Sequence, residues 1–174
     1  NGGEETPYTG EDRILVPSPQ VPTYDLKPEM NAAGITSQFI EDIKQQRHDV
    51  IICNFANADM VGHTGKLEAT AEAVSTLDTC VARIVQAVTK AQGTVIVTAD
   101  HGNAEKLWDR QRNGPHTAHT TNPVPILLID EDTKDKGYKL DDGSLRDVAP
   151  TLLSIAGIEI PSVMTGSDLR TWVD

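Results

Sequence analysis

Three short polar motifs, each beside an apolar run, carry the residues best suited to chemistry. They read NADMVGH, ADHGN and HTAHT, and their candidate metal ligands are Asp59, His63, Asp100, His101, His116 and His119. Asp59 and His63 stand four positions apart, so a turn of helix would place both side chains on one face. Carboxylate and neutral imidazole together suit Zn²⁺, Mn²⁺ and similar divalent ions.

Each motif taken alone also has an ordinary structural explanation. Asp100 could cap a helix that begins at Gly102 or Asn103, and His63 beside a glycine could belong to a turn. Taken together, however, the candidate ligands exceed one ordinary site, which favours a pair of metals. Such pairs typically serve phosphoryl transfer or hydrolysis. His48 has no comparable neighbours in the sequence and is expected to be a surface residue.

Helical and strand patterns alternate along the chain. The predicted strands are 13–17, 49–55, 94–98 and 124–129, and the predicted helices are 36–47 with Thr36 or Ser37 as N-cap, 67–91, and 150–156 with Gly157 as its end. This order predicts the α/β class, as a three-layer α/β/α domain with a largely parallel sheet. In such sheets ligands collect beyond the carboxyl ends of the strands. Residues 1–34 predict an extended connecting arm, and residues 35–174 a metal-binding domain.

Composition limits the possible partners. Fifteen basic against twenty-six acidic residues give a net charge of −11, which argues against a nucleic-acid or anionic-membrane surface. Cys53 and Cys80 both lie in apolar patterns and are expected to be buried thiols of a reducing compartment. No apolar stretch approaches the roughly 20 residues of a membrane span, and no signal peptide is evident.

Longer stretches around the three motifs resemble a known family. NADMVGHTGKLEAT, VTADHGNAE and PHTAHTTNPVPILL, in that order, are similar to the metal-binding motifs of cofactor-independent (2,3-bisphosphoglycerate-independent) phosphoglycerate mutase, of the alkaline phosphatase superfamily. The resemblance continues in GEDRILVPSP, TYDLKPEM and DVAPTLLSIAGI, and so covers essentially the whole chain. It implies an alkaline-phosphatase-like fold, with this chain as the C-terminal part of the phosphatase domain, missing its N-terminal strands.

The resemblance also implies two manganese sites, with Mg²⁺ or Co²⁺ as alternatives, and no need for 2,3-bisphosphoglycerate. Asp59, His63 and His119 match the ligands of one metal. Asp100 and His101 match part of the ligand set of the other.

Two further positions are singled out by the resemblance. His116 is the second choice for the ligand of the third motif, or a partner that orients a ligand. Gln20, in VPSPQVPTYD, stands where the family usually has a lysine near the phosphoserine. Glutamine can donate a hydrogen bond there but brings no charge, unless Lys27 substitutes.

Members of the family interconvert 3-phosphoglycerate and 2-phosphoglycerate through a phosphoserine. The serine nucleophile lies upstream of the region that this chain resembles, so we expect no catalytic nucleophile in this chain and no activity from it alone. The resemblance implies a cytoplasmic enzyme with a small-molecule substrate, monomeric when full-length. The alternatives are another phosphohydrolase of the superfamily, a phosphopentomutase, or a metal-binding fragment without turnover.

Overall fold

The structure is a computed structural model that describes residues 6–130 and 137–172. The first five residues of the predicted arm therefore lie outside the described residues. Its helices are η1 Tyr24–Leu26, α1 Ala32–Gln45, α2 Asn57–Gly62, α3 Leu67–Lys90, η3 Leu145–Asp147 and α4 Val148–Ile155. Its strands are β1 Val95–Thr98, β2 Trp108–Asp109, β3 Gly114–Pro115, β4 Ile126–Ile129, β5 Tyr138–Leu140 and β6 Arg170–Trp172.

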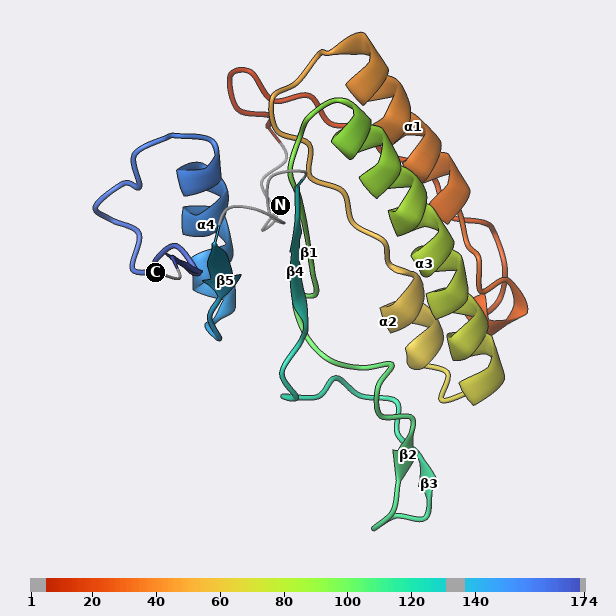
Figure 1. The fold of residues 1–174 in the computed structure, drawn as a ribbon. Helices are drawn as coiled ribbons and strands as arrows, with labels where there is room; N and C mark the ends of the chain where they lie inside the picture. The colour runs from red at the N-terminus through yellow and green to blue at the C-terminus, as the bar shows by residue number, and fades with distance from the viewer. Residues whose placement is uncertain (1–5, 131–136, 173–174) are drawn as a thin grey trace.

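These elements form layers around the pair β1–β4. Helices α1, α2 and α3 lie on one side of this pair, and α4 lies with β5 on the other (Figure 1). The hairpin β2–β3 extends away from the helices at the lower end of the molecule in the same view (Figure 1). The arrangement confirms the α/β class predicted from the alternation of helical and strand patterns.

The helical layer depends on small residues where α1 meets α3. Ala32 and Thr36 of α1 and Ala73 of α3 are completely buried, so the two backbones can approach closely. Helix α3 buries one face along its length, with Cys80 and Ile84 on the same stripe as Ala73. The long predicted helix is thus confirmed to within a residue at its end.

Helix α1 starts earlier than predicted. Its N-cap is Asn31, and Thr36 and Ser37, the predicted caps, lie inside the helix. Their hydroxyl groups donate to the carbonyls of Ala32 and Ala33, each at 2.8 Å. The hydroxyl groups thus have hydrogen-bond partners within the helix and do not cap its N-terminus. The prediction of the cap was therefore wrong, because a side-chain hydroxyl can bond backward to residue i−4 as well as forward.

The strands β1 and β4 pair in antiparallel register. Val95 lies opposite Ile129, and Thr98 lies opposite Ile126. The ladders β2–β3 and β5–β6 are also antiparallel, so the parallel order that we expected does not occur among the ladders of the described residues. This pairing places the end of β1 beside the beginning of β4, and so brings the second and third motifs together.

Two predicted strands form no ladder in the described part of the chain. Residues 49–55 run extended between α1 and α2 without a pairing strand, and so does the segment 13–17. Apolar side chains in both are consequently uncovered: Ile52 is 86% exposed and Leu15 is 91% exposed. Cys53 is exposed as well, contrary to the prediction, whereas Cys80 is buried as expected.

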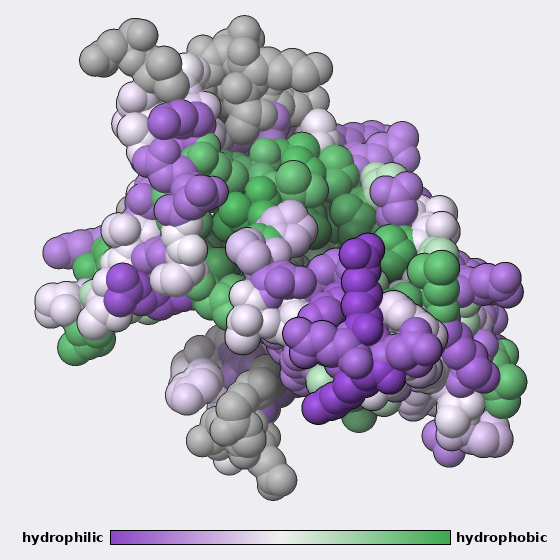
Figure 2. Space-filling view, turned by 90° about the horizontal axis from the view of Figure 1, so that it is seen from below, coloured by the Kyte–Doolittle hydropathy of each residue, from purple (hydrophilic) through white to green (hydrophobic). Residues whose placement is uncertain are grey.

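The chain as a whole keeps a large surface. Its accessible area is 12102 Å², whereas a compact monomer of this size exposes roughly 8,300 Å². Part of the excess is apolar, and Figure 2 shows apolar side chains gathered over the middle of one face. Patches of this kind mark surfaces that other protein segments cover. None of the helices in residues 6–130 and 137–172 has the length and apolar character needed to cross a membrane.

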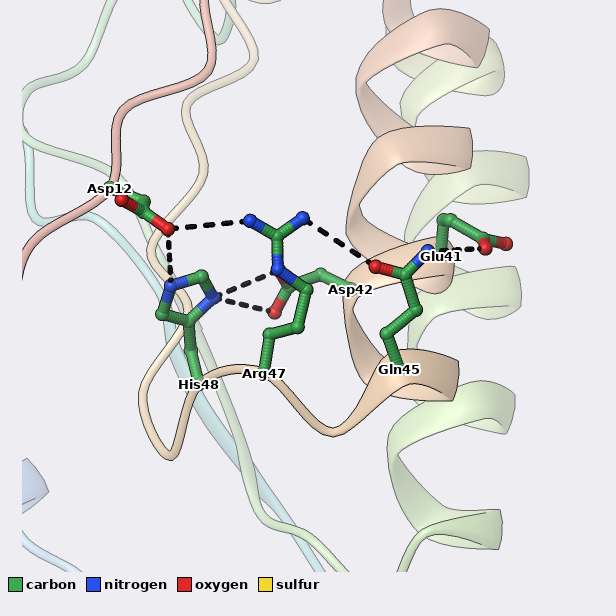
Figure 3. Close-up of polar contacts among 6 residues, drawn as sticks. All are labelled: Asp12, Glu41, Asp42, Gln45, Arg47 and His48. Atoms are coloured by element: carbon green, nitrogen blue, oxygen red, sulfur yellow. Dashed lines mark hydrogen bonds and ion pairs between the residues drawn. The ribbon is translucent and has the colours of Figure 1, made fainter.

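The N-terminal arm is fastened to the end of α1 by a cluster of charged groups. His48 lies between two carboxylates, with Nδ1 at 2.8 Å from Asp42 and Nε2 at 3.2 Å from Asp12 (Figure 3). Arg47 also reaches Asp12, at 3.4 Å. His48 is therefore half-buried and paired, not the isolated surface residue that we predicted. No local pattern reveals the contact with Asp12, because Asp12 precedes His48 by thirty-six positions.

The cluster predicts a pH dependence of stability. The hydrogen bond to Asp42 raises the pKa of His48, and the contact with Asp12 adds to the effect. Because the pKa of His48 is higher in the folded than in the unfolded protein, the protonated ring stabilises the fold. This contribution is complete at a pH below the unfolded-state pKa of about 6.5, and it is lost as the pH rises through the folded-state pKa. We expect His48→Gln to lower the thermal midpoint at pH 6 clearly more than at pH 9. Lys44→Gln, at the same helix end, is the control. Equal losses at the two pH values would contradict the role of the charged imidazole.

Candidate metal centre

Helix α2 presents the first motif. Asp59 lies in its first turn and His63 is its C-cap, and the Nε2 of His63 lies 3.2 Å from the Oδ1 of Asp59. The short helix is held in place by a contact with the arm, because the buried side chain of Asn57 donates to the carbonyl of Pro28 at 2.9 Å. Lys66, just beyond α2, forms an ion pair with the carboxylate of Asp25 in η1, which lowers the pKa of Asp25. The arm thus supports the helix that carries the first two candidate ligands.

The second and third motifs are joined by a short extension of the β1–β4 pairing. The N–H of Thr120 donates to the carbonyl of Gly102 at 2.8 Å, as an isolated antiparallel bridge. A Cβ at position 102 would overlap the hydroxyl of Thr120, so this close approach requires glycine. The carboxylate of Glu105 accepts the Thr120 hydroxyl and the Asn122 amide, the latter at 2.8 Å. The Thr120 hydrogen bond lowers the pKa of Glu105, which keeps this clamp anionic.

Three side-chain atoms that could bind a metal ion, from the first and third motifs, form a small triangle. The Nε2 atoms of His63 and His119 lie 3.1 Å apart. They lie 3.2 Å and 3.1 Å, respectively, from the Oδ1 of Asp59. Ligand atoms bound at about 2.1 Å to a tetrahedral divalent ion lie roughly 3.4 Å from one another, so the triangle has nearly the size that such an ion requires.

The hydrogen bonds around the triangle prepare it for a cation. The Nδ1 of His63 donates to the carbonyl of Thr117 at 2.6 Å, so the proton of the neutral ring lies on that nitrogen. The Nε2 of His63 then points a lone pair at the carboxylate of Asp59, which is also an acceptor. Two acceptors at this distance need a proton or a metal ion between them. Orientation of an imidazole by a carbonyl on its far nitrogen is the usual arrangement of metal-bound histidine.

His101 lies beside this triangle. Its ring stacks on that of His119 with centroids 3.7 Å apart, and Asp59, His101 and His119 each offer a ligand atom within 4.8 Å of the others. Among the described residues the Nδ1 of His101 is buried without a hydrogen-bond partner. Asp100 is 87% exposed, with its carboxylate 3.7 Å from the Nε2 of His101. The structure therefore brings four of the candidate ligands together and leaves Asp100 at the margin.

The two remaining candidates lie elsewhere. His116 directly follows β3, and its backbone N–H donates to the carbonyl of Leu107 at 2.9 Å. Its Nδ1 is buried without a partner in the described part of the chain. Gln20 is an exposed residue of the arm. The geometry thus groups His119, and not His116, with Asp59.

Asn103 and Thr117 contribute to the site although the sequence analysis did not single them out. The amide of buried Asn103 donates to the Oδ1 of Asp59 at 2.9 Å and so fixes the carboxylate. A Cβ at Gly62 would overlap the side-chain oxygen of Asn103, so the glycine leaves room for this contact. Thr117 acts through its backbone carbonyl, which no residue type reveals. The sequence signal for these contacts is weak: Gly62 directly precedes His63, and Asn103 stands two positions after His101.

Known proteins share the sequence and the fold of this chain. The sequence model of the metalloenzyme superfamily matches residues 1–160. The chain belongs to this superfamily. Its membership agrees with a donor set made of imidazole and carboxylate groups.

Individual relatives indicate a narrower group within the superfamily. The chain is 50% identical over 171 residues to a 2,3-bisphosphoglycerate-independent phosphoglycerate mutase of Coxiella burnetii, and 53% identical over 170 residues to that of Syntrophotalea carbinolica. These alignments cover 98% and 97% of the chain but 32% of each relative, so the chain spans about a third of their length. A Leishmania mexicana phosphoglycerate mutase, crystallised at low cobalt concentration, superimposes with a TM-score of 0.81 and 34% identity over 90% of this chain and 31% of that one. The structural match confirms the alkaline-phosphatase-like fold implied by the resemblance.

The triangle of Asp59, His63 and His119 predicts which substitutions weaken metal binding most. We expect Asp59→Asn or His119→Gln to weaken Mn²⁺ binding more than about 100-fold, beyond the loss that follows removal of an outer partner. His116→Gln changes the same residue type three positions away and is expected to leave the affinity nearly unchanged. The measurement is a Mn²⁺ titration followed by the electron paramagnetic resonance signal of the free ion. Equal losses in His116→Gln and His119→Gln would contradict the assignment.

Proposed function

We propose that this chain is the C-terminal part of the phosphatase domain of a 2,3-bisphosphoglycerate-independent phosphoglycerate mutase. Residues 1–34 would form its connecting arm and residues 35–174 its metal-binding part. The intact enzyme would interconvert 3-phosphoglycerate and 2-phosphoglycerate in glycolysis and gluconeogenesis, through a phosphoserine formed on a serine outside this chain. The observation that carries the proposal is the convergence of Asp59, His63 and His119, in a chain about half identical to such mutases.

The residues divide between two metal sites. Asp59, His63 and His119 would hold one Mn²⁺, and Asp100 and His101 would supply part of a second site, with Mg²⁺ or Co²⁺ as the alternative ions. No 2,3-bisphosphoglycerate would be required. When bound, one ion would lower the pKa of the serine hydroxyl, and both would neutralise charge on the transferred phosphoryl group.

The protein's own part in this chemistry is to fix the ligands before any ion arrives. The carbonyl of Thr117 holds the proton of His63 on Nδ1, and the amide of Asn103 holds one oxygen of Asp59. Ligands whose orientation is fixed in this way lose little freedom on binding. The net charge of −11 repels a dianionic substrate, so the bound ions would have to make the site locally positive.

The proposal also covers the substrate, the assembly and the location of the intact enzyme. We infer a small-molecule substrate, no nucleic-acid or membrane partner, a monomeric full-length enzyme and a cytoplasmic location, because a glycolytic mutase acts in that setting. Gln20 would take the position near the phosphoserine through a neutral hydrogen bond, and His116 would remain a residue outside the ligand set.

A metal-binding fragment without turnover is the second candidate for the isolated chain. It is favoured by the incomplete second site, in which Asp100 is 87% exposed and His101 keeps an unpartnered nitrogen among the described residues. A superfamily phosphohydrolase or a phosphopentomutase is the alternative for the intact protein, and substrate specificity separates these from the mutase.

Direct measurement of 2-phosphoglycerate formation by ³¹P nuclear magnetic resonance tests the proposed function. We expect the full-length enzyme to convert 3-phosphoglycerate only with Mn²⁺ or a similar ion, and to lose activity after chelation. Asp59→Asn should lower turnover at least about 1,000-fold, since it removes a ligand of the ion that stabilises the transition state. His48→Gln, whose side chain lies in the arm cluster, should retain activity within about twofold. Turnover by the 174-residue chain alone, or by the full-length enzyme after chelation, would contradict the proposal.

A further inference from the structure

Asn103 is a buried polar residue whose two side-chain polar atoms are in opposite situations. The residue is only 4% exposed, and its amide nitrogen donates to the Oδ1 of Asp59 at 2.9 Å. Its own oxygen, by contrast, is buried without a hydrogen-bond partner among the described residues. Buried polar atoms usually have a partner, and one that lacks a partner lowers the stability of the fold. The presence of asparagine at this position therefore needs a reason other than stability.

The orientation of this amide is set by Asp59. An ionised carboxylate can only accept hydrogen bonds, so the group that faces it must be the NH₂ of Asn103. The amide oxygen then lies against α2, where a Cβ at position 62 would overlap it. Gly62 is thus the residue that makes room for this oxygen. The amide serves the carboxylate of Asp59 while its own acceptor stays unsatisfied.

The backbone around Asn103 is held on both sides. Just before it, the carbonyl of Gly102 accepts the N–H of Thr120 at 2.8 Å. Just after it, the N–H of Lys106 donates to the carbonyl of Asn103 at 3.1 Å and closes a turn. A buried side chain on a fixed backbone has few positions open to it. Asn103 can consequently act as a fixed donor for Asp59, which is carried by the six-residue helix α2.

The carboxylate oxygen that Asn103 contacts is the one that belongs to the triangle. The Oδ1 of Asp59 lies 3.2 Å from the Nε2 of His63 and 3.1 Å from that of His119. A carboxylate oxygen has two lone pairs, so the amide can take one and leave the other for an ion. The side chain of Asp59 is 33% exposed, so water could satisfy this oxygen if the amide were absent. Water would not, however, hold the oxygen in one direction.

We propose that Asn103 is a positioning residue of the metal centre, whose amide directs the Oδ1 of Asp59 toward the ion at a cost in the stability of the fold. This role rests on the proposed metal site of Asp59, His63 and His119. Partners that orient a metal ligand typically change the metal affinity about 10- to 100-fold when they are removed. A residue that served only the fold would lower the stability instead.

Metal affinity and stability can be measured separately in the same variants. Asn103→Ala and Asn103→Val remove the donor together with the unpartnered oxygen, and they differ in the volume that remains. The Mn²⁺ affinity is measured from the electron paramagnetic resonance signal of the free ion, and the thermal midpoint is measured in EDTA. Asn57→Ala is the matched comparison, because Asn57 is also buried but donates to the carbonyl of Pro28. Asn54→Ala, at an exposed position, is the neutral control.

We expect both Asn103 variants to bind Mn²⁺ about 10- to 100-fold more weakly than the unmodified chain. Their thermal midpoints should stay within about 2 °C of the unmodified value or rise, because the unpartnered oxygen is gone. Asn57→Ala should lower the midpoint by more than about 4 °C, because it leaves a buried carbonyl unpaired. An unchanged Mn²⁺ affinity in either Asn103 variant, or a fall of their midpoints as large as that of Asn57→Ala, would overturn the proposal.

Cobalt gives a signature of ligand orientation that a purely structural residue would not change. The visible absorption of bound Co²⁺ depends on the geometry of its ligands. At saturating Co²⁺ we therefore expect Asn103→Ala to alter the spectrum and Asn54→Ala to leave it unchanged. Identical spectra for Asn103→Ala and the unmodified chain would overturn the role in orientation.

Asp59→Asn separates this role from the proposed function. If Asp59→Asn binds Mn²⁺ as tightly as the unmodified chain, the proposed metal site is wrong and the role of Asn103 falls with it. If Asp59→Asn loses affinity while Asn103→Ala does not, the metal site stands and the positioning role alone is overturned. We expect losses in both variants, with the larger loss in Asp59→Asn.

Discussion

Antiparallel pairing of β1 with β4 decides where the candidate metal ligands of the second and third motifs lie. The end of β1 leads into Asp100 and His101, and the segment before β4 contains His116 and His119. Antiparallel neighbours bring the end of one strand beside the start of the next, and the bridge between Gly102 and Thr120 extends this contact toward the ligands. Without that register the second and third motifs would leave the sheet at opposite edges.

The first motif reaches the same place by helix packing. Helix α2 is only six residues long and too short to be stable alone, so its position depends on its contacts. Asn57 bonds to the arm at Pro28, and Lys66 pairs with Asp25. Pro28 is buried, and η1, which lies just before it in the arm, packs against α2. The arm is thus a structural part of the site. The same arm also contacts His48, through the carboxylate of Asp12.

Much of this could be predicted from the sequence. The 3.6-residue periodicity of residues 67–90 and the apolar runs of β1 and β4 located the main elements, and the three motifs located the candidate ligands. The convergence of the motifs was predicted from the carboxyl ends of a parallel sheet. That reasoning cannot explain HTAHT, which precedes its strand; antiparallel pairing can.

Other features depend on tertiary contacts that no local pattern contains. Residues 49–55 have the composition of a buried strand but form no ladder in the described part of the chain, because a strand also needs a neighbour. Backbone groups such as the Thr117 carbonyl are invisible in residue types, and the short strands of the β2–β3 hairpin carry no alternation of polar and apolar residues. The pairing of His48 with Asp12 and Asp42 joins residues that only the folded arm brings together.

The central claim is that Asp59, His63 and His119 form a site for a divalent ion. The most direct measurement is anomalous diffraction at the manganese absorption edge from crystals of the protein equilibrated with Mn²⁺. We expect a peak within about 2.3 Å of the Asp59 carboxylate and of the Nε2 atoms of both histidines, as for metal–ligand bonds in general. A crystal saturated with Mn²⁺ that shows no peak at this triangle, or shows its peaks only at other residues, would contradict it.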